Sequence, residues 1–215
     1  NPSAGFSIVT ANSLPTTNQT FGHGLNATPH FIIGKNRAQS SQWDVYHKDV
    51  GINKLFYLNT SAAASNAASN NSTYPTAPTS SVFGFRANGA TNNYVWLCFA
   101  PVEGYSAFGS YTGNGSSDGP FVYTGFRPRW LLLRCSSLSQ LWLVLDSARD
   151  EYNIMSKAIQ AHVSDAEIDN ATNYGVDFTS NGFKIRSSTD RTNGSGQTYI
   201  YAAFAENPFK TARAR

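Results

Sequence analysis

Three closely spaced glycines, Gly113, Gly115 and Gly119, are the first candidates for a functional site, because glycine-rich loops can bind phosphate groups. A dinucleotide-binding loop has G-x-G-x-x-G after a strand and before a helix, whose N-terminal amides face the phosphates. Here the spacing is G-x-G-x-x-x-G, and the following PFVYTGF begins with proline and has the pattern of a strand. We therefore predict no phosphate site. Asn-Gly and Asp-Gly pairs favour positive φ, so we predict a hairpin turn between strands.

Alternating carboxylates in the segment SDAEID are the one candidate for a metal site. Asp165, Glu167 and Asp169 are spaced so that their oxygens could converge on Ca²⁺. The segment lacks the glycine and the distal glutamate of an EF-hand loop, and a polar strand face or surface loop explains the same pattern. This calcium candidate is weak, and we predict no metal ligand.

The sequence contains no specific motif for nucleophilic or acid–base catalysis. No G-x-S-x-G sequence occurs, and His47, in VYHKD, is predicted to be solvated or locally bonded. Cys98 and Cys135 lie in apolar runs, WLCFA and LLLRC, which favours buried free thiols over a disulfide. We predict no catalytic residue and no cofactor. Glycoside hydrolysis needs two carboxylates brought together by the fold, which a sequence alone cannot reveal.

The elements that would position any site are short strands. Apolar runs rich in aromatic and β-branched residues are separated by clusters of Gly, Asn, Ser and Pro, a pattern typical of an antiparallel sandwich. Helical periodicity is weak, so the alanine-rich residues 61–70 and the segment 156–168 are predicted to be loops. The predicted strands are FSIV, HFIIG, WDVYH, KLFYL, VFGF, YVWLCFA, FVYTGF, RWLLLRC, LWLVLD, VDFTSNGFKI and YIYAAFA.

An internal repeat organises these strands. NGATNNYVWLCFA (residues 88–100) aligns without a gap with NGSGQTYIYAAFA (193–205), at an offset of 105. PHFIIGKNRAQSSQWDV (29–45) aligns with PRWLLLRCSSLSQLWLV (128–144) at an offset of 99. Phe6 and Thr10 similarly align with Phe108 and Thr112. The fold prediction is therefore all-β, with two tandem antiparallel β-sandwich units, jelly-roll or lectin-like, at residues 1–104 and 105–215.

Tryptophans can stack on sugars, but the repeat favours another role for two of them. Trp43 and Trp142 occupy equivalent positions in the two units. A residue that both units need irrespective of a ligand is more simply a packing residue, so we expect both side chains in the core.

Composition limits the classes of partner. Charged residues make up 13% of the chain, against about 25% in an average soluble domain, and aromatic residues also make up 13%. The formal net charge is +3, and apart from the C-terminal residues the basic residues are dispersed, so we expect no nucleic-acid partner. No run approaches the roughly 20 apolar residues of a membrane helix, so we expect no membrane insertion. Polar, weakly charged surfaces are typical of extracellular and virion proteins.

Three long phrases carry a family resemblance: VEGYSAFGSYTGNGSSDGPFVYTGFRPRWLLLR, LDSARDEYN and YIYAAFAENPFK. They resemble a repeat domain of virion proteins of tailed, often marine, bacteriophages, described as tail-fibre or structural proteins. The resemblance extends from Gly5 to Lys210; Cys135 and the segment LPTTNQ depart from it. It implies a β-sandwich virion component without known catalytic residues, and it carries over no binding residue.

The resulting expectation is a non-enzymatic phage structural protein, a tail fibre, spike or capsid surface component that serves host-surface adhesion. Its expected location is the virion surface, and its expected partners are other virion proteins, further copies of itself (a trimer by analogy) and a host surface glycan. Residues 59–81 and 152–172 differ in length between the units and are the expected contact loops. A virion glycan depolymerase and a purely architectural spacer or cement protein remain the alternatives.

Overall fold

The computed structural model describes residues 1–67, 73–87 and 92–206, and in these residues it divides the chain into two compact all-β units. Unit 1 comprises Asn1–Asn59 and Ala64–Val102. Unit 2 comprises Glu103–Arg215 together with the short segment Thr60–Ala63. The predicted boundary between residues 104 and 105 lies two residues from this one, but the sequence did not indicate that Thr60–Ala63 belongs with unit 2.

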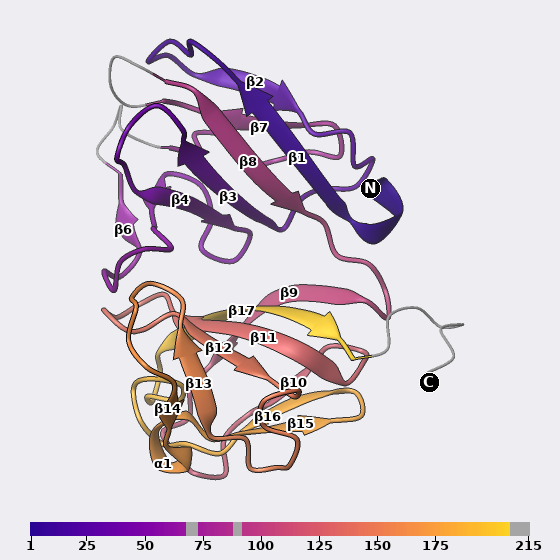
Figure 1. Ribbon diagram of the computed structural model, residues 1–215, viewed down its shortest axis with the longest axis vertical. Coiled ribbons are helices and arrows are strands. Elements are labelled where there is room, and N and C mark those ends of the chain that lie inside the picture. Colours follow the sequence, from indigo (N-terminus) through magenta and orange to yellow (C-terminus); the bar gives the residue numbers. More distant parts are fainter. Residues whose placement is uncertain (68–72, 88–91, 207–215) are drawn as a thin grey trace. The chain divides into compact units, whose positions relative to one another are not determined.

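Unit 1 is built on a four-stranded antiparallel sheet in the order β1-β8-β3-β4 (Figure 1), accompanied by the pairs β2-β7 and β5-β6. Alternate residues of β8, including Trp96 and Cys98, are buried, because successive side chains of a strand point to opposite faces. The elements are η1 (Pro2–Ala4), β1 (Phe6–Ala11), β2 (Gln19–Gly22), β3 (Phe31–Asn36), β4 (Trp43–His47), β5 (Lys54–Leu55), β6 (Ser65–Asn66), β7 (Val82–Phe85) and β8 (Tyr94–Phe99).

Aromatic side chains dominate the core of unit 1. Trp96, fully buried on β8, contacts Phe83 and Phe85 of β7 edge-on, with ring centroids 5.3 and 4.9 Å apart. Tyr94 stacks on the same indole at 5.5 Å. The large sheet and the β2-β7 pair therefore share one apolar cluster, in which Cys98 is a buried free thiol, as predicted.

Unit 2 contains a six-stranded antiparallel sheet, β14-β13-β12-β11-β17-β9, and a three-stranded one, β10-β16-β15 (Figure 1). Leu131 and Leu133 of β11 share a buried cluster with Phe178 and Phe183 of the smaller sheet. The elements are β9 (Ser106–Thr112), β10 (Phe121–Tyr123), β11 (Pro128–Cys135), β12 (Leu143–Asp146), β13 (Lys157–Gln160), β14 (Ile168–Asp169), α1 (Ala171–Tyr174), β15 (Val176–Thr179), β16 (Gly182–Ile185) and β17 (Thr198–Ala205).

The two units use the same strand order, because β1-β8-β3-β4 corresponds to β9-β17-β11-β12. The hydrogen-bonded register reproduces the two offsets found in the sequence. Ile33 faces Leu97 across β3 and β8, and Leu132, 99 residues after Ile33, faces Ala202, 105 residues after Leu97. The internal repeat is therefore a repeat of strand pairing as well as of residue types.

The predicted alignment of the first strand is wrong by two residues. Phe6 pairs with Phe99, whereas Ser106 pairs with Phe204, so Phe6 corresponds to Ser106 and not to Phe108. A shift of two residues returns a side chain to the same face of the sheet. The apolar pattern is unchanged by such a shift, and residue types alone could not detect it.

The prediction that both equivalent tryptophans are core residues is correct for Trp142 and wrong for Trp43. Trp142 is 1% exposed, and the guanidinium carbon of Arg134 lies 5.0 Å from its ring centre. Trp43 is 38% exposed. The residue that pairs with Trp43 is Lys35, whose ammonium bonds instead to the carbonyls of Gln39 and Ser41. Arg134 thus covers the indole of Trp142, whereas Lys35 bonds elsewhere and leaves the indole of Trp43 accessible.

Two segments predicted to be loops contain short strands. Within 156–168, Lys157–Gln160 forms β13, because Leu143 and Val144 of β12 accept it as a neighbouring strand. Within 61–70, Ser65–Asn66 forms β6, while residues 68–70 lie outside the described ranges. Among the helices of the described residues, none has the length and apolar character needed to cross a membrane.

Candidate functional site: a braced loop and pocket in unit 2

The glycine-rich segment is a connection between sheets and not the predicted hairpin. It joins β9 to β10, but β9 pairs with β17, whereas β10 pairs with β16. A hairpin would require β9 and β10 to pair with each other. The prediction fails because turn-forming dipeptides identify a reversal of the chain but not the strands that flank it in space.

One buried side chain, Asn193, holds this loop in place. Its amide nitrogen lies 2.8 Å from Asn114 Oδ1, 2.6 Å from the Ser116 carbonyl and 2.9 Å from the Ser187 carbonyl. Its amide oxygen accepts the backbone N–H of Asn114 at 2.9 Å. Asn193 is 0% exposed, so these polar groups have no bulk water as an alternative partner. The loop is thereby fixed before any ligand arrives.

The glycines of the loop serve close packing. A Cβ at Gly113 would lie 2.2 Å from the Gly194 carbonyl oxygen, and one at Gly119 would lie 2.7 Å from the Ile185 carbonyl oxygen. Gly115 has φ +70°, a conformation that glycine adopts without strain. The glycine spacing that resembled a phosphate loop is thus explained by backbone contact with residues 185–194.

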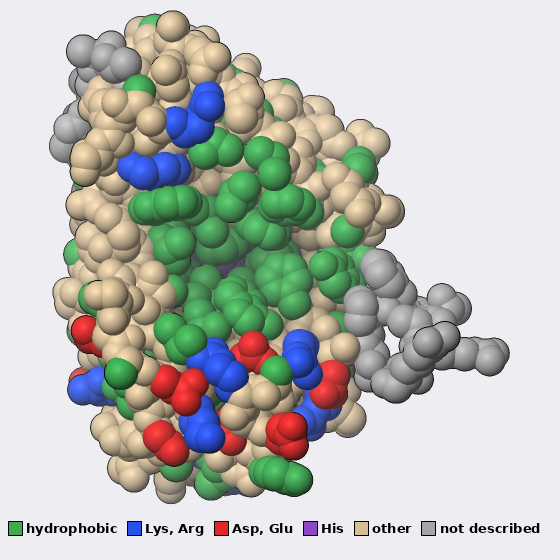
Figure 2. All heavy atoms as spheres, viewed as in Figure 1, with side chains coloured by type: hydrophobic (Ala, Val, Ile, Leu, Met, Phe, Trp, Pro, Cys, Tyr) green, Lys and Arg blue, Asp and Glu red, His purple; other side chains and the backbone are tan. Residues whose placement is uncertain are grey.

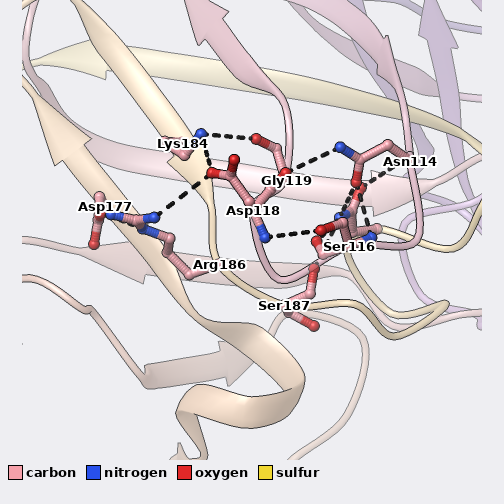
Figure 3. Close-up of polar contacts among 9 residues, drawn as sticks. Asn114, Ser116, Asp118, Gly119, Asp177, Lys184, Arg186 and Ser187 are labelled. Atoms are coloured by element: carbon pink, nitrogen blue, oxygen red, sulfur yellow. Dashed lines mark hydrogen bonds and ion pairs between the residues drawn. The ribbon is translucent and has the colours of Figure 1, made fainter.

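A network of charges borders the loop on the side of β16 (Figure 3). Lys184 Nζ lies 2.7 Å from Asp118 Oδ1 and also donates to the Gly119 carbonyl at 3.1 Å. The hydrogen bond from Lys184 lowers the pKa of the Asp118 carboxyl below its ordinary value, so Asp118 is ionised at neutral pH. Arg186 Nε donates to Asp177 Oδ2 at 2.5 Å, and Arg186 Nη1 lies 3.9 Å from Asp118. Two cations and two carboxylates therefore balance each other.

An open pocket of about 290 Å³ lies beside this network. Its lining combines three hydroxyl groups, one guanidinium group and two aliphatic side chains. Ile154 is 49% exposed there, which leaves an apolar surface accessible to a ligand. The lining residues are Ser117, Ile154, Ala171, Thr172, Arg186 and Ser188.

The pocket is suited to binding a polar molecule. In the described part of the chain, the only hydrogen bond of the Arg186 guanidinium is the one to Asp177, so most of its five N–H donors are available. Serine and threonine hydroxyls both donate and accept. The aliphatic groups of Ile154 and Ala171 add a surface for C–H groups. Hydroxyl-rich ligands combine these same features.

The carboxylates that suggested calcium are not brought together. Glu167 pairs with Arg149 at 3.0 Å, and Asp169 accepts the Ser156 hydroxyl at 2.5 Å. Across residues 1–67, 73–87 and 92–206, no three His, Cys, Asp or Glu side chains are close enough to hold a metal ion. Glu167 and Asp169 thus serve separate contacts, and Asp165 is exposed.

His47 makes a local bond that its equivalent in unit 2 reproduces. His47 Nδ1 accepts the backbone N–H of Asp49 at 3.2 Å, and Asp146 Oδ1 accepts that of Ala148 at 2.7 Å. Both residues therefore stabilise the turn after the fourth strand of their unit. His47 is locally bonded, as predicted, although it is buried and not solvated.

Sequence reasoning missed the pocket itself. Ile154, Ala171 and Thr172 fall within the predicted contact loop 152–172, and Ser117 lies in the glycine-rich stretch, but Arg186 and Ser188 had no distinguishing signal. These six residues come from three separate parts of the sequence, and no short motif links them. The repeated Asn-Gly of residues 88 and 193 could have indicated Asn193; Asn88 lies outside the described residues.

The surface charge differs between the units. Unit 1 holds five of the 16 basic residues and two of the 13 acidic residues. Unit 2 therefore holds eleven basic and eleven acidic residues. Figure 2 shows the acidic and basic side chains intermixed over unit 2 on the face in view. Beside the pocket, Lys184 and Arg186 are paired with Asp118 and Asp177.

Comparison with known proteins identifies the family. The family model for a domain of unknown function (DUF7483) matches residues 1–208. This match covers nearly the whole chain, so the protein belongs to the DUF7483 family. No curated protein and no solved structure matches it significantly.

Proposed function

We propose that this member of the DUF7483 family is a non-enzymatic structural protein of a tailed-bacteriophage virion, displayed on the particle surface, where it attaches to the host cell. In this proposal the two units are tandem β-sandwiches, and the chain assembles symmetrically as part of a tail fibre, spike or capsid surface. The sequence phrases that resemble phage virion repeats motivate the virion setting.

The observation that carries the adhesive role is the pocket of unit 2. It is open, it lies beside a loop fixed by the buried Asn193, and among the described residues its guanidinium and hydroxyl groups have unused hydrogen-bonding capacity. Two carboxylates beside it, Asp118 and Asp177, are held by Lys184 and Arg186. That arrangement favours binding over acid–base catalysis, which would need a carboxyl group free to exchange a proton with a substrate.

Display on a particle makes a weak site effective. A small open pocket binds one ligand weakly, but many copies on one particle raise the effective concentration of every site after the first has bound. Overall avidity can then exceed the single-site affinity by about 10²–10⁴. A repeated, weakly charged all-β surface protein suits this mode of attachment.

The proposal is tested on intact particles. Antibodies against the purified chain should label virions of a phage that encodes it, at a regular position seen by electron microscopy, and the purified chain should compete with virions for host cells. Absence of the chain from purified virions would overturn the virion setting. Labelling without competition would instead favour the architectural spacer or cement alternative.

A further inference from the structure

We propose that the pocket formed by Ser117, Ile154, Ala171, Thr172, Arg186 and Ser188 binds an uncharged sugar residue of a surface glycan. This inference names the ligand class of the adhesive site and rests on the proposed function for its biological setting. The binding itself is a property of the isolated chain and can be measured without virions.

The hydrogen-bonding groups match a sugar. Adjacent sugar hydroxyls each donate and accept, and the pocket offers serine and threonine hydroxyls that do both. Arg186 adds N–H donors, and because its Nε is held by Asp177 at 2.5 Å the guanidinium plane is oriented in advance. A ligand that only donates, such as an ammonium group, would leave the Arg186 donors without acceptors.

The balance of charge favours a neutral ligand. Arg186 and Lys184 are the cations beside the pocket, and Asp177 and Asp118 neutralise them at 2.5 and 2.7 Å. An acidic sugar would gain from Arg186 but would also approach these two carboxylates. An uncharged residue can use the guanidinium as a hydrogen-bond donor without that repulsion.

The size and the apolar surface of the pocket favour a single sugar residue as the ligand. A volume of about 290 Å³ is just below the range for small-molecule pockets, which is about 300–1,000 Å³. The exposed side chain of Ile154 provides an apolar surface for the C–H groups of a sugar ring. The rest of a glycan chain would extend into solvent through the open side of the pocket.

The fixed loop reduces the cost of binding. Ser117 belongs to the loop that Asn193 bonds at Asn114 and Ser116. A ligand then does not have to order these residues, which raises affinity for a given set of contacts.

The experiment uses the whole chain on an array of neutral and acidic bacterial surface glycans, followed by calorimetry with the free oligosaccharide of each hit. Ser188→Trp fills the pocket from an exposed position, and Ser40→Trp adds the same side chain at an exposed position of unit 1. Arg186→Lys keeps the charge opposite Asp177 but removes the guanidinium fork. Circular dichroism and melting temperature establish that each variant is folded.

We expect neutral glycans to bind, with affinity reduced about tenfold or more by Ser188→Trp and by Arg186→Lys and unchanged by Ser40→Trp. Hits that survive both pocket substitutions, or a preference for acidic glycans, would overturn the inference. A folded chain that binds no glycan at all would also overturn it, while antibody labelling of virions would show separately whether the proposed function holds.

Discussion

Asn114 and Asn193 form a reciprocal pair: Asn193 Nδ2 lies 2.8 Å from Asn114 Oδ1, and Asn193 Oδ1 accepts the backbone N–H of Asn114 at 2.9 Å. Residues 79 positions apart in sequence are joined in this way, and the glycine-rich loop is attached to the turn before β17. Because Asn193 is buried, the pair replaces water as the partner of several backbone groups.

Asn193→Ala should therefore lower the free energy of unfolding by about 2–3 kcal/mol, since a buried unsatisfied group costs about 1–3 kcal/mol. Hydrogen exchange should also accelerate at residues 113–119. Denaturant unfolding and hydrogen-exchange mass spectrometry measure the two effects. Asn18→Ala, at an exposed position, is the control and should change stability by less than about 0.5 kcal/mol. Equal effects of the two substitutions would contradict the bracing role of Asn193.

Gly113→Ala should destabilise unit 2, because the added Cβ would lie 2.2 Å from the Gly194 carbonyl oxygen and 2.8 Å from the Asn193 carbonyl carbon. Both neighbours are backbone atoms that cannot rotate away, and overpacking of this kind costs about 1–3 kcal/mol. Gly22→Ala is the matched control, since its Cβ would approach nothing closer than the Ser81 carbonyl oxygen at 3.9 Å. Thermal unfolding should show a lower melting temperature for the first variant only.

Asp44 should make unit 1 less stable as the pH rises. Burial raises the pKa of its carboxyl from 3.8 to about 7, although Lys35 opposes the shift. The folded protein therefore keeps this proton between about pH 4 and pH 7, where the unfolded chain releases it. The stabilising contribution is fully present below pH 4 and is lost as the pH rises through 7.

Asp44→Asn, which resembles the protonated form, should melt several degrees above the parent protein at pH 8 and at nearly the same temperature at pH 4. Tyr57, Tyr74 and Tyr94 are the other titratable groups that Asp44 influences, and their pKa values are raised, so they stay neutral across this range. Asp49→Asn, at an exposed carboxylate paired with Lys48, is the control. A stability difference for Asp44→Asn that does not depend on pH would refute the assignment.

Arg134→Met should loosen the segment Thr60–Ala63. Arg134 donates to the carbonyls of Thr60, at 2.7 Å, and Ala62, and it stacks on Trp142. Methionine fills much of the same volume but donates no hydrogen bond, so both carbonyls lose their partner. Limited proteolysis should cut near residues 60–63 faster than in the parent protein. Arg37→Met, at an exposed position, should leave the cleavage rate unchanged.

The sequence indicated the strand content and the repeat because both depend on local patterns. Alternation of apolar residues in YVWLCFA reflects one buried face of β8. The gap-free match at an offset of 105 corresponds to a repeated strand pairing, β3 with β8 and β11 with β17. The alignment of Phe6 with Phe108 was wrong by two residues. Because apolar residues alternate with a period of two in a strand, a shift of two residues leaves the apolar pattern unchanged.

The two equivalent tryptophans show that a sequence repeat does not predict the burial of a side chain. Trp43 and Trp142 align in the internal repeat, yet Trp43 is exposed and Trp142 is covered by Arg134. Burial depends on what lies over a side chain, and for Trp142 that includes a cation anchored by Thr60 and Ala62, more than 70 residues away.

Taken alone, the sequence determined that this protein is built from strands in two related parts and that its glycine-rich stretch lacks the spacing and the following helix of a nucleotide-binding loop, because such patterns are local properties. Only the tertiary structure decided that this stretch connects two sheets, that Asn193 fixes it, and that Arg186, Ser117 and Ser188 meet at one pocket. Those relationships join residues distant in the chain, and they exist only after the sheets have formed.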